Sequence, residues 1–340
     1  MHGFVTQTCK NGGTEPEKEE NEGMDVSVII VNYNTADLIA DCIKSIRKHT
    51  VGVDYEIVIV DNHSTENARD IILGQCGSEG IGYIQLQENV GFGRANNEGF
   101  KVARGRNVFC LNPDTVLLNN AIKTLSDYLD ANPNVGACGG NLYDAQMQPT
   151  HSYMMFTPSV EWELHMLTFH KLEPLVYGRS RKFCYGNKPK QVAYITGADL
   201  MMRRSTVERT GGFSPDFFMY FEETDLCRRI AAMGLRIMCV PEARIQHLEG
   251  MSYERGKEYT VNELSLRHWE QGRMTFYRRN ASATTTRVAN GIYRTALAVN
   301  KMCFRIVGKP IWKSYACRQR IVGELSKAQR AVKNDKKQQQ

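Results

Sequence analysis

Long apolar runs are missing from this 340-residue sequence. A helix that crosses a membrane needs about 18 or more consecutive apolar residues, and no window provides them, so we expect no membrane-spanning segment. The first 23 residues contain five glutamates, two lysines and no apolar run, which does not fit a secretory signal. Their polar, aperiodic composition predicts that residues 1–23 are disordered.

Paired cysteine motifs are missing as well. The ten cysteines are scattered singly along the chain, and no two of them form a C-x-x-C pair. This pattern argues against a zinc knuckle and against a disulfide framework. Together with the missing signal, it predicts reduced thiols and a cytoplasmic protein.

Acidic residues are scarce near the C-terminal end. From residue 284 onward, thirteen lysines and arginines stand against Glu324 and Asp335, whereas the net charge of the whole chain is only +6. The basic charge therefore belongs to the last part of the chain. No nucleic-acid recognition motif accompanies it, so we expect no nucleic-acid partner.

Strand-like and helix-like patterns alternate from residue 25 onward. Short apolar runs at 25–32 and 55–60 are typical of strands buried on both faces. Helical spacing follows each of them, and the alternation predicts an α/β fold with a mostly parallel central sheet. Further strands are expected at 82–86, 107–111, 192–195 and 235–240, and further helices at 66–73, 94–103, 205–210 and 223–233.

Two boundaries follow from the same patterns. Pro241 is expected to end the strand 235–240. Beyond about residue 255 the spacing is helical throughout. We therefore predict an α/β domain over 24–255 and a basic helical extension over 256–340.

Polar residues collect just after the predicted strands, where ligands of open α/β sheets bind. One such group is Asn112-Pro113-Asp114. A carboxylate at this position suits a hard divalent cation that bridges a diphosphate, although a simple Asn-Pro-Asp turn is the alternative. His247 could join Asp114 on one metal, but a single histidine is more often structural.

An aromatic run at 217–221 precedes three carboxylates, Glu222, Glu223 and Asp225, at the start of a predicted helix. Helix N-termini favour negative charge, so capping is one explanation. Apolar flanks also desolvate a carboxylate and raise its pKa, as a general base requires.

The segment Gly91-Phe-Gly-Arg94 imitates part of a dinucleotide-binding fingerprint. Asn96 replaces the third glycine, however, and the segment does not follow the first strand of the sheet. These departures argue against a nicotinamide-dependent oxidoreductase. Arg94 in a glycine-rich turn could still face phosphate groups.

In their order along the chain, these motifs resemble the family 2 glycosyltransferases of the GT-A fold, a Rossmann-like fold for nucleotide-sugar transferases. The likeness is greatest to the rhamnosyltransferase-like members that build bacterial polysaccharides, and it covers about residues 25–280. The motifs that carry it lie at 28–34, 57–62, 89–97, 111–115, 196–199 and 218–228, with Pro241-Glu-Ala and His247 completing the set.

The resemblance implies a role for each matching position. Mn2+ or Mg2+ would be bound by Asp114 and His247, beside Asn112, which replaces the first aspartate of the family's Asp-x-Asp motif. Glu223 would be the catalytic base, with Asp225 as the second choice, because the family usually has Glu-Asp where this chain has Glu222-Glu223. The nucleotide sugar would be bound by Asn32, Tyr33, Asn34, Asp61, Asn62, Arg94, Asn97, Asn112 and Gly197.

The implied reaction is a single inverting displacement. It would transfer one sugar, rhamnose from dTDP-rhamnose in the closest analogy, to a saccharide or lipid-linked acceptor in the synthesis of bacterial surface polysaccharides. The Gln-x-x-Arg-Trp motif of processive synthases is absent; Trp269-Glu-Gln-Gly-Arg273 does not match it. The irregular stretch 140–195, which includes Trp162, is expected to shape acceptor recognition.

Two alternatives remain at this point. Asn112 and the Glu-Glu pair also fit a catalytically inactive GT-A domain that binds a nucleotide sugar or a partner enzyme. The predicted helix 287–307, with its basic flanks, fits either an interfacial helix at the inner face of the plasma membrane or an ordinary packing helix.

Overall fold

The computed structural model describes residues 23–171, 175, 178–248 and 261–338. Nearly all of the predicted disordered segment 1–23 lies outside these ranges, and so does the predicted boundary at 255/256. Among the helices in the described ranges, none has the length and apolar character that crossing a membrane requires.

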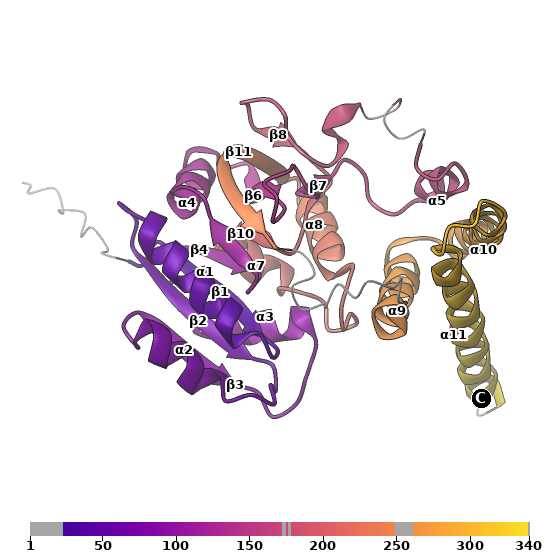
Figure 1. Ribbon diagram of the computed structural model, residues 1–340, viewed down its shortest axis with the longest axis horizontal. Coiled ribbons are helices and arrows are strands. Elements are labelled where there is room, and N and C mark those ends of the chain that lie inside the picture. Colours follow the sequence, from indigo (N-terminus) through magenta and orange to yellow (C-terminus); the bar gives the residue numbers. More distant parts are fainter. Residues whose placement is uncertain (1–22, 172–174, 176–177, 249–260, 339–340) are drawn as a thin grey trace, which may run out of the picture.

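A large central sheet with helices on both faces forms the main body of the molecule (Figure 1). Its strand order is β3-β2-β1-β4-β10-β6-β11-β5, and β8 pairs with β11. Four of the seven neighbouring pairs along this order are parallel, whereas β10, β5 and β8 run antiparallel to their partners. The predicted α/β fold with a mostly parallel sheet is therefore confirmed. The strands are β1 (Val26–Asn32), β2 (Tyr55–Asp61), β3 (Ile81–Gln85), β4 (Asn107–Leu111), β5 (Thr115–Leu117), β6 (Val135–Tyr143), β8 (Lys190–Gln191), β10 (Asp199–Arg203) and β11 (Arg236–His247).

Apolar residues on both faces of β1 explain why the sheet lies between two layers. All seven residues of this strand are buried. Alternate side chains point to opposite faces of a strand, so Val28 and Ile30 join one core cluster and Ile29 joins the other. The first cluster is covered by α1 (Ala36–His49), α2 (Ala68–Cys76) and α4 (Ala121–Ala131), and the second by α3 (Phe92–Val102), α7 (Arg204–Thr210) and α8 (Glu222–Ala232).

The structure differs from the sequence prediction at Pro241, which does not end its strand. β11 continues to His247, with an irregularity in its pairing with β6 between Cys239 and Arg244. Proline has no N–H to donate, and a bulge is a place where a strand tolerates this loss. The expected strand at 192–195 is also wrong in part. Only Tyr194–Ile195 is a strand, β9, and it pairs with β7 (Tyr153–Met154) in a separate small sheet.

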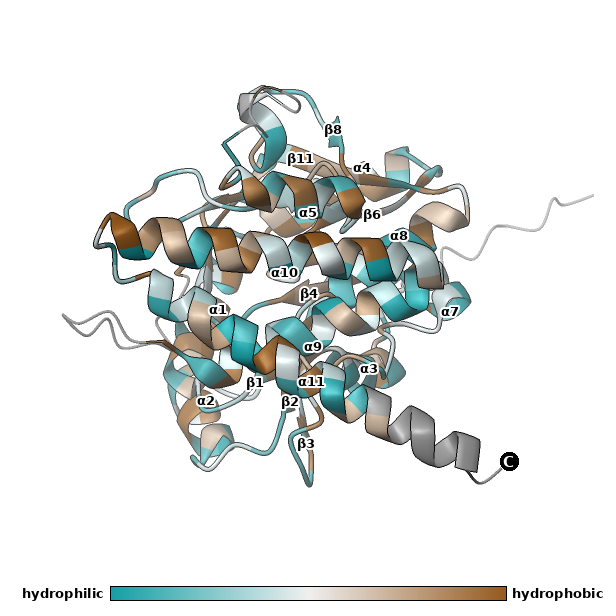
Figure 2. Cartoon of the chain, turned by 90° about the vertical axis from the view of Figure 1, so that its right-hand side faces the viewer, coloured by the Kyte–Doolittle hydropathy of each residue, from teal (hydrophilic) through white to brown (hydrophobic). Residues whose placement is uncertain are grey.

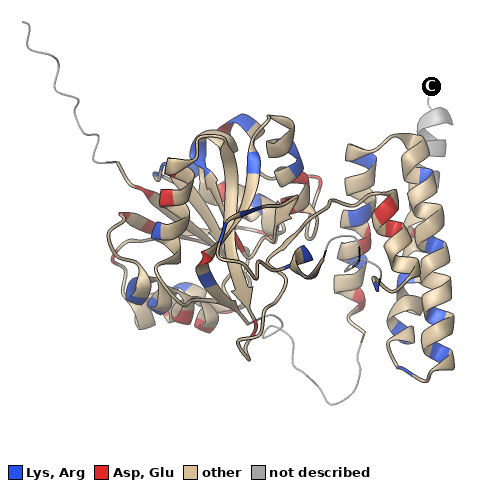
Figure 3. Cartoon of the chain, turned by 90° about the horizontal axis from the view of Figure 1, so that it is seen from above, with Lys and Arg blue, Asp and Glu red and all other residues tan. Residues whose placement is uncertain are grey.

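The C-terminal part consists of α9 (Glu263–Asn280), α10 (Ala283–Ile306) and α11 (Trp312–Gln338), which confirms the predicted helical extension. Helix α5 (Val160–Leu167), from the middle of the chain, lies beside α10 (Figures 1 and 2). Tyr293 and Leu297 of α10 form a separate core cluster with Met166 of α5 and Val322 of α11. Lysine and arginine residues are spread along α10 and α11 (Figure 3). Helix α5 and the C-terminal helices therefore form one unit beside the sheet.

Candidate functional site

The carboxyl ends of β1, β2 and β4 open onto a cavity of about 360 Å³, where the polar clusters were predicted to gather. Its lining contains four of the predicted site residues: Tyr33, Asn62, Asn112 and Asp114. Tyr33 is half exposed, whereas Asn62 is buried. We call this space the strand-end cavity. Its other lining residues are Val31, Thr35, Leu38, Asn89, Gly91, Phe92, Pro113, Met219 and Tyr220.

Asn32 and Asp61 support the floor of this cavity without lining it. Asn32 Nδ2 donates to Asp61 Oδ2 at 3.2 Å, and the same oxygen accepts the Tyr83 hydroxyl at 2.7 Å. Asp61 Oδ1 accepts the backbone N–H of Ser64 at 2.7 Å. Although burial opposes ionisation, hydrogen bonds from Tyr83 and Ser64 hold the pKa of Asp61 below its ordinary value. The carboxylate is therefore charged at neutral pH and fixes the turn after β2.

Two asparagines shape neighbouring turns in the same way. Asn34 has a left-handed backbone, with φ of 57°, and its side-chain oxygen accepts the backbone N–H of Thr65 at 2.8 Å. Asn62 Nδ2 donates to Asn89 Oδ1 at 2.9 Å, and Asn89 Oδ1 also accepts the N–H of Gly91 at 3.0 Å. Asn89 was not predicted as a site residue, but its side chain connects the turn after β2 to the glycine-rich turn.

The predicted metal ligands Asp114 and His247 do lie together. His247 is opposite Thr115 in the antiparallel pairing of β11 with β5, and this register places its Nε2 3.3 Å from Asp114 Oδ1. Asn112 Nδ2 is 3.4 Å from the same ring nitrogen. The part of β11 after Pro241, which the sequence prediction missed, therefore positions His247 beside Asp114.

A carboxylate oxygen and an imidazole nitrogen are ligands that Mn2+ accepts, so the donor set fits such a cation. The described residues contain no cluster of three or more histidine, cysteine or acidic side chains that could hold a metal alone. A cation at Asp114 and His247 would need further oxygen ligands from a bound molecule, and the phosphates of a nucleotide could supply them.

The aromatic loop 217–221 forms one wall of the strand-end cavity. The backbone N–H of Phe92 donates to the carbonyl of Phe218 at 3.0 Å, and a Cβ atom on Gly91 would overlap that carbonyl. Gly91 also has a φ of +86°. Position 91 requires glycine because the backbone of Phe218 approaches it closely. This approach explains the glycine at position 91 without a bound dinucleotide.

Tyr220 and Phe221 are consecutive non-glycine residues with left-handed backbones, with φ values of 68° and 71°. Such residues are uncommon and occur more often at functional sites. Tyr220 lines the strand-end cavity and also a second cavity of about 390 Å³. The strained segment is therefore common to the two spaces.

Glu223 lines the second cavity, which we call the aromatic cavity. Burial raises the pKa of Glu223, and burial together with the neighbouring Glu223 charge raises that of Glu222 well above its ordinary value. Glu222 is buried and does not line either cavity. Of the two glutamates, Glu223 is the one that can meet a ligand. The remaining lining consists of His151, Met154, Phe156, Pro158, Trp162, His170, Lys182, Tyr194, Thr196, Tyr220, Phe221, Thr224 and Trp269.

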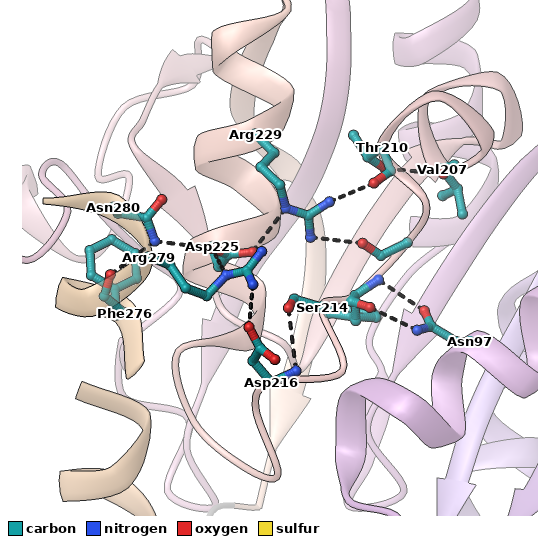
Figure 4. A network of polar contacts seen from close by, with 12 residues as sticks. Asn97, Val207, Thr210, Ser214, Asp216, Asp225, Arg229, Phe276, Arg279 and Asn280 are labelled. Carbon is teal, nitrogen blue, oxygen red and sulfur yellow. Dashed lines mark hydrogen bonds and ion pairs between the residues drawn. The ribbon is translucent and has the colours of Figure 1, made fainter. Parts of the chain in front are cut away.

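Asp225 lies outside both cavities, in the polar network of Figure 4. One carboxylate oxygen accepts from Arg229 at 2.8 Å, and the other accepts from Asn280 at 3.0 Å and from Arg279 at 3.4 Å. Asp225 is buried and accepts hydrogen bonds from three side chains. It therefore connects α8 to the end of α9.

Arg94 and Asn97 are also not among the residues that line the two cavities. Arg94 Nε donates to the carbonyl of Pro215 at 3.0 Å. Asn97 donates to the carbonyl of Phe213 at 2.8 Å and accepts its N–H at 2.9 Å, next to Ser214 in Figure 4. Both residues fasten the segment that leads into the aromatic loop. Gly197 lies between Phe92 and Glu223, where a Cβ atom would be 3.3 Å from the phenyl ring.

Trp269 is a further residue of this site that the sequence prediction missed. It comes from α9 and lines the aromatic cavity together with Trp162 of α5. The sequence signal was weak, because a tryptophan in an amphipathic helix is usually a packing residue.

Comparisons with known proteins bear on this geometry. The model of the family described as "Glycosyl transferase family 2" matches residues 27–211. A low-salt glycan biosynthesis hexosyltransferase, Agl10 of Haloferax volcanii, is 27% identical over 217 residues, which cover 63% of this chain and 64% of that protein. A poly-beta-1,6-N-acetyl-D-glucosamine synthase of Staphylococcus epidermidis is 30% identical over 141 residues, 41% of this chain and 33% of that protein.

Among solved structures, the mannosyltransferase PcManGT from Pyrobaculum calidifontis, in complex with GDP-Man and Mn2+, superposes with a TM-score of 0.54. It is 17% identical in sequence, and the match covers 89% of this chain and 86% of that chain. The likeness to this structure concerns the fold, whose GT-A assignment from the sequence is confirmed.

Proposed function

Because the chain belongs to glycosyl transferase family 2, we propose that it transfers a single sugar from a nucleotide-sugar donor to a saccharide or lipid-linked acceptor. The donor binds in the strand-end cavity and the acceptor in the aromatic cavity. The observation that carries this proposal is the position of Tyr220, which lines both spaces. Because the two cavities share this residue, a donor in one would lie next to an acceptor in the other.

The donor assignment draws on the polar floor of the strand-end cavity. Tyr33 and Asn62 line it and would contact the nucleotide base and ribose, while Asn32, Asn34 and Asp61 hold the turns beneath. We assign dTDP-rhamnose as the first donor to test, on the motif resemblance alone. Hexose donors linked to GDP or UDP are the competing choices.

Asp114 and His247 would hold Mn2+ or Mg2+ against the donor diphosphate, with Asn112 beside them. When bound, such a cation neutralises phosphate charge and so assists departure of the nucleoside diphosphate. The solved mannosyltransferase with GDP-Man and Mn2+ supports testing Mn2+ first.

Glu223 is the proposed base of an inverting displacement. Its carboxylate takes the proton of the acceptor hydroxyl while the hydroxyl oxygen bonds to the anomeric carbon, and the bond from that carbon to the donor phosphate breaks. The raised pKa of Glu223 suits a base that must be charged yet basic near neutral pH. Asp225 is a weaker candidate, because Arg229, Arg279 and Asn280 contact its oxygens.

The cellular setting belongs to the same proposal. The name of the Haloferax relative refers to glycan biosynthesis and that of the Staphylococcus relative to a polysaccharide synthase. We propose that this chain adds a sugar to a surface glycan from the cytoplasmic side of the membrane, where nucleotide sugars are made.

The exposed face of α10 supports contact with that membrane. Val288, Met302 and Ile306 are 47%, 57% and 76% exposed. At 100° per residue they fall on one side of the helix, and Arg287, Arg294 and Arg305 form a row along its edge. An apolar strip beside a basic row is the pattern of an interfacial helix on anionic lipid.

Flotation with vesicles of phosphatidylglycerol and phosphatidylcholine tests the membrane proposal. We expect the wild-type chain to float with these vesicles at low salt, and the Met302→Asp/Ile306→Asp variant to remain at the bottom. Val51→Asp is the matched control, because Val51 is 65% exposed on the α/β domain. Equal flotation of all three proteins would contradict a role for α10.

The decisive experiment for the activity measures release of nucleoside diphosphate from a panel of nucleotide sugars with Mn2+. We expect slow hydrolysis of one donor without acceptor, and faster release with a suitable acceptor. Donor binding without hydrolysis or transfer for any donor would instead favour an inactive GT-A domain.

A further inference from the structure

We propose that Trp162 of α5 and Trp269 of α9 together form the binding surface for a pyranose ring of the acceptor. The inference rests on the proposed function, and it deepens it by assigning the C-terminal helices to the active site. The α/β domain would then bind the donor, while the helical unit would select the acceptor.

The two tryptophans lie where an acceptor must lie. Both line the aromatic cavity that also holds Glu223. Their ring centroids are 5.9 Å apart with 39° between the ring planes, and Phe221 packs against both, at 6.4 and 5.2 Å. Both indoles are only partly buried. Partly exposed indoles beside a few polar groups are typical of ligand pockets, and the C–H faces of a pyranose are apolar enough to pack on them.

Charge narrows the class of acceptor. Among the described residues that line the aromatic cavity, Glu223 is the one carboxylate, and Lys182 lies in the same lining. The ammonium group of Lys182 balances the charge of the Glu223 carboxylate, so these two residues give the lining no net negative charge to attract a cation. A neutral or anionic sugar therefore fits better than an amino sugar with a free ammonium group.

Buried ionic contacts hold both tryptophans in place. Glu163, the residue after Trp162, accepts from Arg273 of α9 at 2.6 and 2.8 Å, and both side chains are fully buried. Glu270, the residue after Trp269, accepts from the Tyr293 hydroxyl and contacts Arg318 at 3.3 Å. Buried ion pairs add little net stability. Their geometry instead fixes how α5, α9, α10 and α11 pack and where the two indoles point.

Helix α9 also contacts Tyr220, which lines both cavities. A Cβ atom on Gly272 would overlap the carbonyl of Tyr220 and the ring of Phe221. One helical turn earlier, His268 stacks on Phe218 with 4.7 Å between ring centroids. The helix that supplies Trp269 therefore packs directly on the aromatic loop, so its position bears on both sides of Tyr220.

The chain contains three tryptophans, and this makes a direct binding test possible. Trp312, the third, lies on α11 outside both cavities, near Arg305. In the full-length Trp312→Phe protein, all indole fluorescence comes from Trp162 and Trp269. We expect titration with octyl glycosides of rhamnose, glucose, galactose and mannose to change this fluorescence for at least one sugar. No change with any of them, up to their solubility limits, would overturn the proposal.

Kinetics gives a second, independent test in the full chain. We expect Trp162→Leu and Trp269→Leu to raise the KM for the active octyl glycoside by about tenfold or more, in line with the loss of an aromatic anchor. Every kinetic parameter of Trp312→Leu, a change outside both cavities, should stay within about twofold of wild type. Unchanged acceptor KM in both variants would overturn the assignment.

The two tests also separate this inference from the proposed function. A wild-type chain that neither hydrolyses nor transfers any donor contradicts the activity, yet the fluorescence titration still decides whether the two indoles bind a pyranose. Should Trp269→Leu lose donor hydrolysis as well, the acceptor KM of Trp162→Leu decides the assignment, because Trp162 lies on α5 and not on α9, the helix whose Gly272 packs on the Tyr220 carbonyl.

Discussion

The backbone N–H of Phe92 donates a 3.0 Å hydrogen bond to the carbonyl of Phe218, across 126 positions of sequence. This bond joins the glycine-rich turn to the aromatic loop, and thus the donor side of the proposed site to the segment before Glu223. Gly91 makes the approach possible, because any side chain there would meet the Phe218 carbonyl.

We therefore expect Gly91→Ala to destabilise the protein and weaken donor binding. Gly91 and Gly77 share an extended, positive-φ backbone, with φ/ψ of 86°/168° and 70°/174°, but a Cβ atom on Gly77 would meet nothing within 4 Å. Gly77→Ala should therefore lower the free energy of unfolding only by the strain of alanine in this backbone conformation, about 1–3 kcal/mol. Gly91→Ala should lose more in urea unfolding and raise the donor Kd, and equal losses would contradict a role for the contact with Phe218.

Glu223→Gln should abolish sugar transfer and leave donor affinity nearly unchanged, because the amide keeps the shape of the side chain but cannot accept the proton. Glu222→Gln is the matched control: Glu222 is the adjacent residue and buried, but it lines neither cavity. We expect it to retain activity. Transfer rates and calorimetric donor titrations check both variants, and a large rise in donor Kd for Glu223→Gln would show that the side chain binds donor instead.

The pH dependence of kcat should reflect the ionisation of Glu223. Burial raises the folded-state pKa of Glu223 above the ordinary glutamate value of 4.5. A base works in its charged form, so activity is present above the raised pKa and is lost as the pH falls through it. We expect the acid limb of kcat to lie above pH 4.5. An acid limb at or below the ordinary value would point to a solvent-exposed base.

How far could sequence reasoning reach this site? It predicted Asp114 and Glu223 because each stands at a predictable junction, the end of a strand and the start of a helix. It ranked Glu223 above Asp225 from the resemblance alone, since the helix start does not tell which carboxylate faces the cavity and which meets Arg279 of α9. That contact joins segments 54 residues apart.

The motif containing Arg94 and Asn97 shows a second limit. Its polar residues suggested phosphate contacts, whereas their hydrogen bonds go to the backbone of Phe213 and Pro215. A pattern of residue types does not reveal whether a ligand or the chain itself takes the hydrogen bonds. Trp269 was missed for a related reason, because only the packing of α9 on the aromatic loop gives that side chain a place in the site.

Loss of either proposed metal ligand should weaken Mn2+-dependent donor binding. We expect Asp114→Ala and His247→Ala each to raise the donor Kd in the presence of Mn2+, while binding in EDTA stays equal to that of wild type in EDTA. Asp41→Asn, a change at an exposed carboxylate on α1, is the control and should behave as wild type. If both alanine variants bind donor with Mn2+ as tightly as wild type does, the pair holds no cation.

The buried pair Glu163–Arg273 offers a test of how the helical unit is held together. Removing one partner leaves an uncompensated buried charge, which costs about 3–5 kcal/mol, so Arg273→Met alone should lower the free energy of unfolding strongly. Replacing both partners, as Glu163→Leu/Arg273→Met, should restore most of it, because each charge then disappears with its partner. Urea unfolding of wild type, both single variants and the double variant gives the coupling energy. If the losses in unfolding free energy are additive, the two side chains do not depend on each other. The double variant should still raise the acceptor KM, because without the ion pair the angle between Trp162 and Trp269 is no longer fixed.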